Sequence, residues 1–334
     1  MSAENINNMS ISDYLNKEQI KFSLNDCGRS LPNVFDGMKE SHRKIMYGIF
    51  LKNCKDSIKV AQLAGFVAEK TNYHHGEQNL FETITKLAQD FVGSNNIPYL
   101  QKDGQFGTRL MGGKDAANAR YIFTKLSKIT RVLFPKQDDA LLNYVYDEGE
   151  KVEPTYYLPI IPTILVNGCK AGIGTGWSTS IPCYDPEVLI DYIINYLNGE
   201  SLPKLEPYYK GFTGKIKKKD KFSYETEGIF ESDGKKITIT ELPVMTWTDK
   251  YKEFLEGLLE SKKIKSFKNY STPKKIKFEI VEGDMKLTKH NLKLVNTIST
   301  SNMVLFVKDD KLKKFKDVEE ILNYFIDERF NLYK

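Results

Sequence analysis

The sequence is poor in cysteine and has no cysteine pair at the spacing of a zinc site. Its cysteines, Cys27, Cys54, Cys169 and Cys183, show no Cys-x-x-Cys motif, so neither a zinc site nor a disulfide framework is indicated. A chain of this kind is typical of a reducing compartment inside the cell.

Long hydrophobic runs are also missing. No apolar stretch approaches the roughly 20 residues that a membrane-spanning helix needs, and the first residues show no charged-then-apolar leader. We therefore expect a chain that is neither secreted nor embedded in a membrane.

Charge of one sign is not dominant either. The 49 lysines and arginines exceed the 44 acidic residues by a net charge of only +5, far from a histone-like tail. Such a balance fits a nucleic-acid partner only if the cations gather on one face.

With 334 residues, 40% of them hydrophobic, the chain is long enough for two domains, each with its own hydrophobic core.

What the sequence does contain is a glycine-rich, cationic stretch from Gln101 to Thr124. It includes Gly104, Gly107, Gly112 and Gly113, together with Lys102, Arg109, Lys114 and Arg120, and it leads directly into Tyr121. Glycines let a backbone approach a ligand closely, and cations suit a phosphate-bearing partner. The stretch predicts either an anion-binding loop that delivers Tyr121 to its target or a solvated loop in which Tyr121 anchors the next strand.

Helical periodicity precedes this stretch. Apolar residues recur at helical spacing from Ser41, over residues 57–70 and again after the turn that contains His74 and His75. Amphipathic helices joined by a short glycine-containing turn and followed by a basic loop are typical of a winged helix. The paired histidines suggest a metal site without a third ligand or, alternatively, hydrogen bonding to phosphate.

A second glycine-rich run, Gly172 to Gly176, presents Ile173 on a narrow hairpin-like tip. An isoleucine between glycines usually packs into a core. The alternative is a wedge that enters a stacked ligand.

The pattern changes after about residue 187. Strand-like alternation over residues 236–240 and 275–281 is mixed with helical patterns over residues 188–197, 249–259 and 318–333. Lysine-rich turns at 215–221 and 262–268 separate these segments and are most often solubility devices. The prediction for the whole chain is an α+β fold.

Taken together, these segments closely resemble the DNA breakage–reunion region of type IIA DNA topoisomerases of the eukaryotic and large-DNA-virus sort. The landmarks, which span about residue 10 to the C-terminus, are Arg29-Ser-Leu-Pro, Asp36-Gly-Met-Lys, Lys59-Val-Ala-Gln-Leu-Ala-Gly, Tyr73-His-His-Gly-Glu, Phe91-Val-Gly-Ser-Asn-Asn, Gly104-Gln-Phe-Gly-Thr-Arg, Gly112-Gly-Lys-Asp, Arg120-Tyr-Ile-Phe-Thr, Gly172-Ile-Gly-Thr-Gly-Trp, Glu241-Leu-Pro-Val and Asn302-Met-Val-Leu-Phe.

The resemblance implies a lead-in segment (1–28), a winged-helix DNA cleavage domain (29–186) and a mixed α/β tower domain (187–334). It implies that Tyr121 attacks a DNA phosphodiester and is joined transiently to the 5′ phosphate while a second duplex passes through the break. It assigns catalytic support to Arg120, Arg29 and His75. The DNA contacts that it implies are Lys39, Arg43, His74, Gln105, Arg109, Lys114 and the intercalating Ile173.

Three departures from the family pattern stand out. Asn118-Ala119 replaces a usual Ser-Pro before Arg120, Glu40 replaces a usual proline, and Cys169-Lys170-Ala171 is one residue longer than the common pattern. These departures affect the geometry expected for the loop before Tyr121, for the start of the helix after Lys39, and for the direction of Ile173.

The sequence shows no ATP-binding domain, no Glu-Gly-Asp or Asp-x-Asp metal motif, and no coiled-coil exit gate. We therefore expect no metal site in this chain, Mg²⁺ ligands and ATP binding supplied by domains elsewhere, and a homodimer of the full enzyme acting on double-stranded DNA. The nucleus and a viral replication site both remain open as locations. A DNA-binding and bending module without cleavage activity of its own is the alternative function, and a winged-helix transcription regulator would leave Arg120-Tyr121 unexplained.

Overall fold

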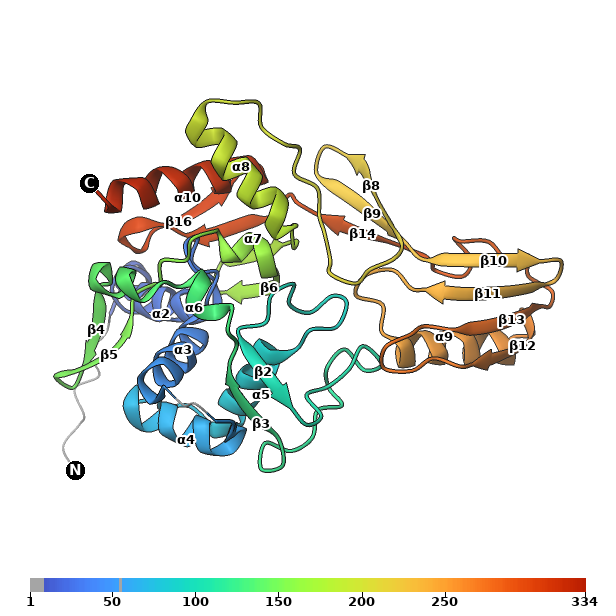
Figure 1. The fold of residues 1–334 in the computed structure, drawn as a ribbon, viewed down its shortest axis with the longest axis horizontal. Coiled ribbons are helices and arrows are strands. Elements are labelled where there is room, and N and C mark those ends of the chain that lie inside the picture. The colour runs from blue at the N-terminus through green and yellow to red at the C-terminus, as the bar shows by residue number, and fades with distance from the viewer. Residues whose placement is uncertain (1–8, 54–55) are drawn as a thin grey trace.

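The computed structural model describes residues 9–53 and 56–334, which form a rounded body and a long arm that projects from it (Figure 1). The body contains three successive helices, α3 (Glu40–Lys52), α4 (Val60–Lys70) and α5 (Glu77–Ala88). They pack through apolar residues at the expected helical spacing, and Ile45, Leu63 and Ile84 are fully buried.

A small antiparallel sheet lies beside these helices. Its strands β1 (Ile58–Lys59), β3 (Phe123–Leu126) and β2 (Leu100–Asp103) have the order β1-β3-β2. Helices followed by a hairpin of this kind make a winged helix. The long glycine-rich connection between β2 and β3 reaches from the body toward the arm (Figure 1).

A nearly continuous helical run precedes the winged helix. It consists of α1 (Ile11–Tyr14), the π-helical turn Leu15–Gln19 and α2 (Ile20–Ser30). Between α2 and α3 the chain turns at Gly37, whose φ is +63° and whose Cα faces the backbone of Ile164 so closely that a Cβ would lie 2.7 Å from it. Only glycine fits this position.

The middle of the chain completes the body with short elements. They are α6 (Thr130–Leu133), a 3₁₀ turn (Lys136–Leu141), the hairpin of β4 (Tyr144–Asp147) and β5 (Glu150–Pro154), α7 (Thr163–Asn167), and the hairpin of β6 (Cys169–Gly174) and β7 (Trp177–Ile181). The last of these hairpins contains Ile173, as the glycine pattern predicted.

The arm, residues 229–294, has a core of its own. Its four-stranded sheet has the order β10-β11-β13-β12, and helix α9 (Thr248–Glu260) packs against it through buried residues that include Leu255. The strands are β10 (Ile229–Asp233), β11 (Lys236–Glu241), β12 (Ile264–Asn269) and β13 (Phe278–Glu282). A second sheet, β8 (Lys215–Asp220), β9 (Ser223–Glu227) and β14 (Val295–Ser299), joins the arm to the body.

The body is built from both ends of the sequence. Helix α8 (Pro186–Asn198), strands β15 (Met303–Phe306) and β16 (Leu312–Phe315), and helix α10 (Val318–Leu332) contribute to the same core as Val34 and Phe35. The backbone N–H of Val34 donates to the carbonyl of Phe306 at 2.9 Å. The predicted boundary at residue 187 therefore does not coincide with a change of core. Helical periodicity is local and does not reveal which distant surface a helix covers.

Cys27, Cys169 and Cys183 are free thiols in this structure. Within residues 9–53 and 56–334, no helix is both long and apolar enough to cross a membrane.

Candidate nucleic-acid interface

Tyr121 is the most exposed aromatic side chain of the glycine-rich connection. Its side chain is 75% exposed, while its neighbours Ala119 and Ile122 are buried. The N–H of Tyr121 donates to the carbonyl of Asn118 at 2.9 Å, and the N–H of Arg120 donates to Asn118 Oδ1 at 3.1 Å. Asn118, one of the departures from the family pattern, thus closes the turn that presents Arg120 and Tyr121 to solvent.

The N-terminal end of helix α4 holds the turn that contains Tyr121. The first N–H groups of α4, those of Val60 and Ala61, donate to the carbonyls of Ile122 at 3.0 Å and Ala119 at 3.1 Å. These donors have no partner within their own helix. The same contacts that satisfy the start of α4 therefore fix the backbone on both sides of Tyr121.

The glycines of the connection allow two of its segments to touch. A Cβ on Gly107 would lie 2.4 Å from the carbonyl oxygen of Gly113, and both residues have positive φ angles. Gln89, at the end of α5, donates from Nε2 to the carbonyls of Phe106 at 2.8 Å and Gly113 at 3.2 Å. The connection is therefore a folded loop that is pinned to α5.

Two hollows flank α5. One, of about 230 Å³, is lined by Arg29, Tyr73 and His75, among others; the second, of about 660 Å³, is lined by Lys114 and Asn118, among others, on the side of the loop. Glu82 and Lys86 line both. The structure thus brings Arg29 and His75 together, and α5 connects their hollow to the loop that continues into Arg120 and Tyr121.

The surroundings of His42 and Lys170 disfavour the charged forms of both side chains. Burial, together with Lys39, Arg43 and Lys86, lowers the pKa of His42 from 6.5 to about 3. Burial also lowers the pKa of Lys170, and Lys86 contributes in the same direction. Lys86, whose Nζ lies 3.5 Å from Glu82 Oε2, contributes to both shifts, so it lies near His42 and Lys170. Periodicity did not single out Lys86 or Lys170, because both lie in the sequence as isolated lysines.

We expect acidification to destabilise the protein through His42. Between pH 6.5 and about 3 the unfolded chain protonates this histidine and the folded chain does not, so the free energy of unfolding falls as pH falls, by up to about 1.4 kcal/mol per pH unit. In His42→Gln this part of the slope is expected to be lost. Urea unfolding at a series of pH values measures it.

The matched control for this measurement is His290→Gln, which removes an exposed histidine of the arm. It is expected to keep the wild-type pH dependence. Identical slopes for wild type and both variants would contradict the assignment to His42.

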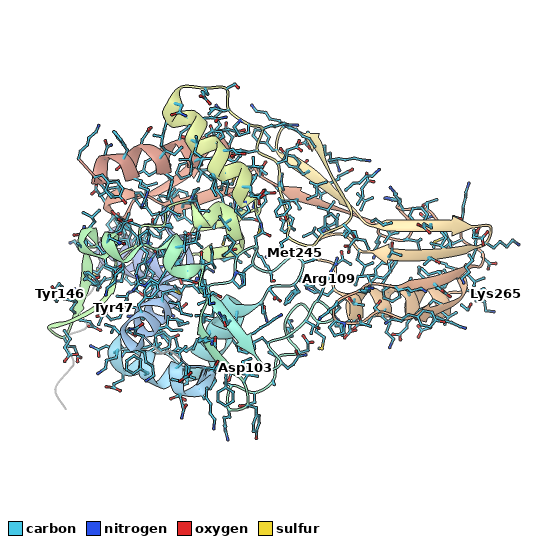
Figure 2. All side chains as sticks on the ribbon, viewed as in Figure 1. Tyr47, Asp103, Arg109, Tyr146, Met245 and Lys265 are labelled. Carbon is cyan, nitrogen blue, oxygen red and sulfur yellow. The ribbon has the colours of Figure 1, made fainter. Side chains whose placement is uncertain are left out.

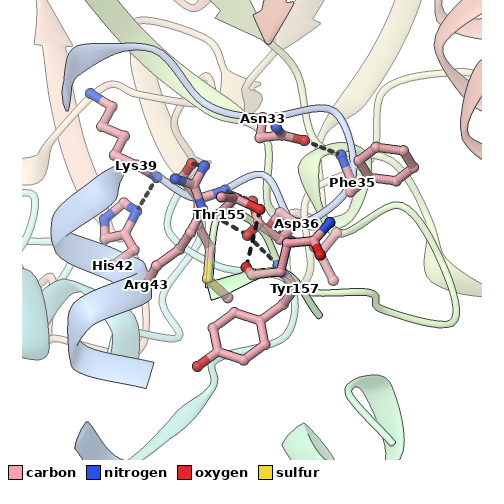
Figure 3. Close-up of polar contacts among 11 residues, drawn as sticks. Asn33, Phe35, Asp36, Lys39, His42, Arg43, Thr155 and Tyr157 are labelled. Carbon is pink, nitrogen blue, oxygen red and sulfur yellow. Dashed lines mark hydrogen bonds and ion pairs between the residues drawn. The ribbon is translucent and has the colours of Figure 1, made fainter. Parts of the chain in front are cut away.

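Two predicted DNA contacts have other partners. Arg43 donates from Nε to the fully buried carboxylate of Asp36 at 2.9 Å and from Nη2 to the carbonyl of Met38 (Figure 3). Arg109 is only 7% exposed and pairs with Glu241. Both guanidinium groups are engaged inside the protein, so the prediction that they contact DNA is not retained. The sequence around a loop arginine does not show whether an acidic partner 132 residues away, as Glu241 is from Arg109, will bury it.

The other predicted contacts are accessible. Gln105, Lys114, His74, His75 and Arg29 are exposed. Lys39 is half-buried, and its ammonium group donates to the carbonyl of Ala171 at 3.3 Å. This contact joins the start of α3 to the β6–β7 hairpin.

The β6–β7 hairpin presents Ile173 with 74% of its side chain exposed. The carboxylate of Asp26 on α2 accepts hydrogen bonds from the N–H and hydroxyl of Thr175, at 2.7 and 2.8 Å. The hairpin tip is thereby fixed to the helix that carries Arg29. Ile173 is therefore accessible to a ligand, and the alternative that it packs into the core is wrong.

No cluster of three or more histidine, cysteine or acidic side chains that could hold a metal ion exists in the described part of the chain. His74 Nε2 lies 3.8 Å from Asp147 Oδ2. Because Mg²⁺ prefers several oxygen ligands in octahedral geometry, the residues of this region do not fit a magnesium site.

Known proteins share this architecture. Residues 29–334 match the family described as the A subunit of DNA gyrase/topoisomerase IV. The chain is 47% identical to DNA topoisomerase 2 of Arabidopsis thaliana, over 97% of this chain and 23% of that protein, and 46% identical to DNA topoisomerase 2 of Invertebrate iridescent virus 6, over 100% of this chain and 30% of that protein. It therefore spans less than a third of the length of these relatives.

A solved structure agrees in fold. The crystal structure of the Plasmodium falciparum topoisomerase II DNA-binding, cleavage and re-ligation domain superimposes with a TM-score of 0.93 at 46% identity, covering 97% of this chain and 46% of that one. The predicted α+β fold and the resemblance drawn from the sequence motifs are confirmed. Since the family match extends over residues 29–334, the chain belongs to the family of type IIA topoisomerases that includes the A subunits of DNA gyrase and topoisomerase IV.

Proposed function

We propose that this chain is the DNA cleavage–religation region of an ATP-dependent type II DNA topoisomerase, with Tyr121 as nucleophile. The observation that carries the proposal is an exposed tyrosine on a backbone fixed by α4, at the end of a loop whose residues Lys114, Asn118 and Ala119 line a hollow beside α5. A tyrosine that served only to anchor the next strand would be buried.

The chemistry suits a phenol. The Tyr121 oxygen attacks phosphorus, the 3′ oxygen of the sugar leaves and takes up a proton, and the product is a 5′ phosphotyrosyl bond. A phenol ionises near pH 10, far below an aliphatic alcohol, so it departs readily when the 3′ hydroxyl returns. The aryl phosphate keeps the bond energy, and resealing needs no other energy source.

The positions of the cationic side chains suggest which phosphate groups each of them binds. Arg120 adjoins the nucleophile and can hold non-bridging phosphate oxygens through paired N–H donors. Arg29 and His75 share one hollow and are proposed to bind the scissile or adjacent phosphates. Donors aimed at the pentacovalent transition state lower the barrier more than donors that bind the ground state equally well. Lys39, His74, Gln105 and Lys114 are proposed as backbone contacts.

Ile173 is proposed to enter the base stack and bend the duplex. Bending costs several kcal/mol and permits wider contact with the protein. We expect Ile173→Ala to reduce the bend measured by energy transfer between fluorophores at the ends of a short duplex. The affinity of the Ile173→Ala variant for DNA is expected to fall by about tenfold. The wild-type side chain offsets a few kcal/mol of unstacking by the contacts that the bent duplex makes, and the variant loses part of those contacts.

Exposed Ile190 of α8 offers the matched control, since Ile190→Ala removes the same side chain elsewhere on the body. Unchanged bending in Ile173→Ala, or an equal loss in Ile190→Ala, would remove Ile173 from this role.

The remaining parts of the enzyme are proposed to lie outside this chain. A metal-binding domain is proposed to supply the Mg²⁺ ligands and an ATPase domain the ATP hydrolysis, in the same or another polypeptide. Two copies would act together, one on each DNA strand. The proposed setting is a reducing compartment, the nucleus or a viral replication site.

The test is a covalent adduct trapped by denaturant. The chain is mixed with supercoiled DNA, Mg²⁺ and the metal-binding domain, digested with protease, and the DNA-linked peptide is sequenced. The proposal predicts a nucleotide on Tyr121 through a 5′ phosphate. The exposed Ile173 also suits a module that only binds and bends DNA; DNA binding without any adduct under these conditions would favour that second function.

A further inference from the structure

Two sequence motifs that the proposed chemistry does not use meet where the arm joins the body. One is the Gly104–Arg109 segment of the loop that leads to Tyr121, and the other is Glu241-Leu-Pro-Val at the end of β11. Figure 2 shows Arg109 and Met245 between the body and the arm, whose far end carries Lys265.

The meeting point is a buried ion pair. Arg109 Nη2 lies 2.6 Å from Glu241 Oε1 and donates to the carbonyl of Leu242 at 2.9 Å. Glu241 also accepts hydrogen bonds from the N–H and hydroxyl of Thr213, at 3.2 and 2.9 Å, and from the N–H of Leu242 at 2.9 Å. With Glu241 only 3% exposed, its carboxylate is held by donors from the loop, from the arm and from the segment that leads into strand β8.

Two further contacts hold the same part of the loop against the arm. The N–H of Asp249, at the start of α9, donates to the carbonyl of Leu110 at 3.0 Å. Gly112 lies against the ring of Trp247 so closely that a Cβ would be 2.5 Å from it. The loop is thus fixed at Arg109, Leu110 and Gly112 to one end of the arm, and at Phe106, Gly113, Ala119 and Ile122 to the body.

We propose that Arg109 and Glu241 form a positioning pair that makes the placement of Tyr121 depend on the position of the arm. Residues 113–118 are the only stretch of chain between the arm contacts and the turn that presents Tyr121. A displacement of the arm therefore pulls on the loop just before Ala119, and the strain reaches the turn that α4 holds through Ala119 and Ile122 on both sides of the nucleophile. This pair acts through the loop and does not touch the DNA.

The consequence for the reaction rests on the function proposed above. Phosphoryl transfer needs the attacking oxygen in line with the leaving oxygen, and a misplacement of about 1 Å can cost about a hundredfold in rate. An arm pushed by bound DNA would transmit that displacement to the nucleophile. Cleavage would then respond to how the duplex lies on the arm as well as to binding near Tyr121.

The test uses Glu241→Gln in the intact protein supplied with Mg²⁺ and its metal-binding domain. The amide keeps the size of the side chain and removes the charge that holds Arg109. We expect the single-turnover rate of adduct formation to fall by about tenfold to a hundredfold, with the Kd for DNA within about twofold of wild type. A structural role alone would not separate rate from affinity in this way.

A second readout does not depend on catalysis. Trypsin cleaves after arginine and lysine, so Arg109 and the exposed Lys114 of the same loop can be compared as cleavage sites. In the wild type, burial and the pair with Glu241 protect Arg109 from cleavage. In Glu241→Gln the ratio of cutting after Arg109 to cutting after Lys114 should rise by about tenfold, because local opening exposes Arg109.

Two more variants complete the design. Arg109→Lys keeps the charge but loses the planar fork, so its rate and trypsin ratio should lie between those of wild type and Glu241→Gln; it carries the test if Glu241→Gln does not fold. Glu279→Gln breaks an ion pair of the arm sheet, Lys236 Nζ to Glu279 Oε2 at 3.1 Å, away from the loop, and should change neither quantity.

The outcomes separate the two proposals. An adduct in wild type with an unchanged rate in Glu241→Gln and Arg109→Lys would overturn the positioning pair and leave the proposed function intact. No adduct in wild type would refute the proposed function, and the trypsin ratio would then decide the pair: a ratio unaffected by Glu241→Gln would overturn it.

Discussion

Tyr121→Phe is expected to abolish the trapped covalent adduct, with a loss of at least about a thousandfold, because no other group replaces a missing nucleophile. DNA affinity is expected to stay within about twofold of wild type. The phenyl ring retains the packing of the side chain, and the phosphate contacts proposed for Arg29, Lys39 and Lys114 are untouched. Quantifying radiolabelled DNA bound to protein after denaturation, beside anisotropy measurements of binding, gives both numbers.

Tyr146→Phe is the control, since Tyr146 is 70% exposed on β4, at the side of the body away from the arm (Figure 2). Adduct formation in this variant should equal wild type. An adduct that persists in Tyr121→Phe, or a parallel loss of DNA binding, would show that Tyr121 does not play the assigned part.

Asp36→Ala is expected to lower the free energy of unfolding by about 3–5 kcal/mol, the typical loss when one partner of a buried ion pair is removed. The Asp36 carboxylate is fully buried and accepts hydrogen bonds from Arg43 Nε and from the N–H groups of Met38 and Tyr157, each at 2.9 Å (Figure 3). The alanine leaves the Arg43 charge and two backbone donors without their acceptor. Chemical denaturation followed by circular dichroism measures the change.

Glu256→Ala serves as the comparison, because Lys252 and Glu256 form an exposed pair on α9 at 3.3 Å. Exposed pairs of this type contribute at most about 1 kcal/mol. If the two substitutions had equal effects, burial of the Asp36 pair would not be what stabilises the segment before α3.

The sequence predicted several local features, although the lysine-rich segments 215–221 and 262–268, which were expected to be turns, largely form strands β8 and β12. The apolar periodicity after Ser41 and over residues 318–333 corresponds to α3 and α10, and the glycine-flanked Ile173 lies on a hairpin. Each of these properties depends on residues within one or two turns of chain. Spacing and turn chemistry are sufficient to predict them.

Features that depend on distant partners were not predictable in this way. Arg109 lies in a cationic loop, yet its guanidinium pairs with Glu241. Lys86 lies near His42 and Lys170, a proximity that no local pattern indicates. The same limit explains why the boundary predicted at residue 187 does not coincide with a change of core. The pattern of α10 shows that it is amphipathic, and only the fold shows that its apolar face packs with Phe35.

The assembly of the body from both ends of the sequence has a consequence for biosynthesis. Strand β15 and helix α10 supply core residues beside Val34 and Phe35, whereas the core of the arm lies entirely between Ile237 and Leu294. As the polypeptide leaves the ribosome, the arm can therefore acquire its structure while the body still waits for its last segment. The nascent body holds exposed apolar surface during that interval, which is when chaperones would be needed most.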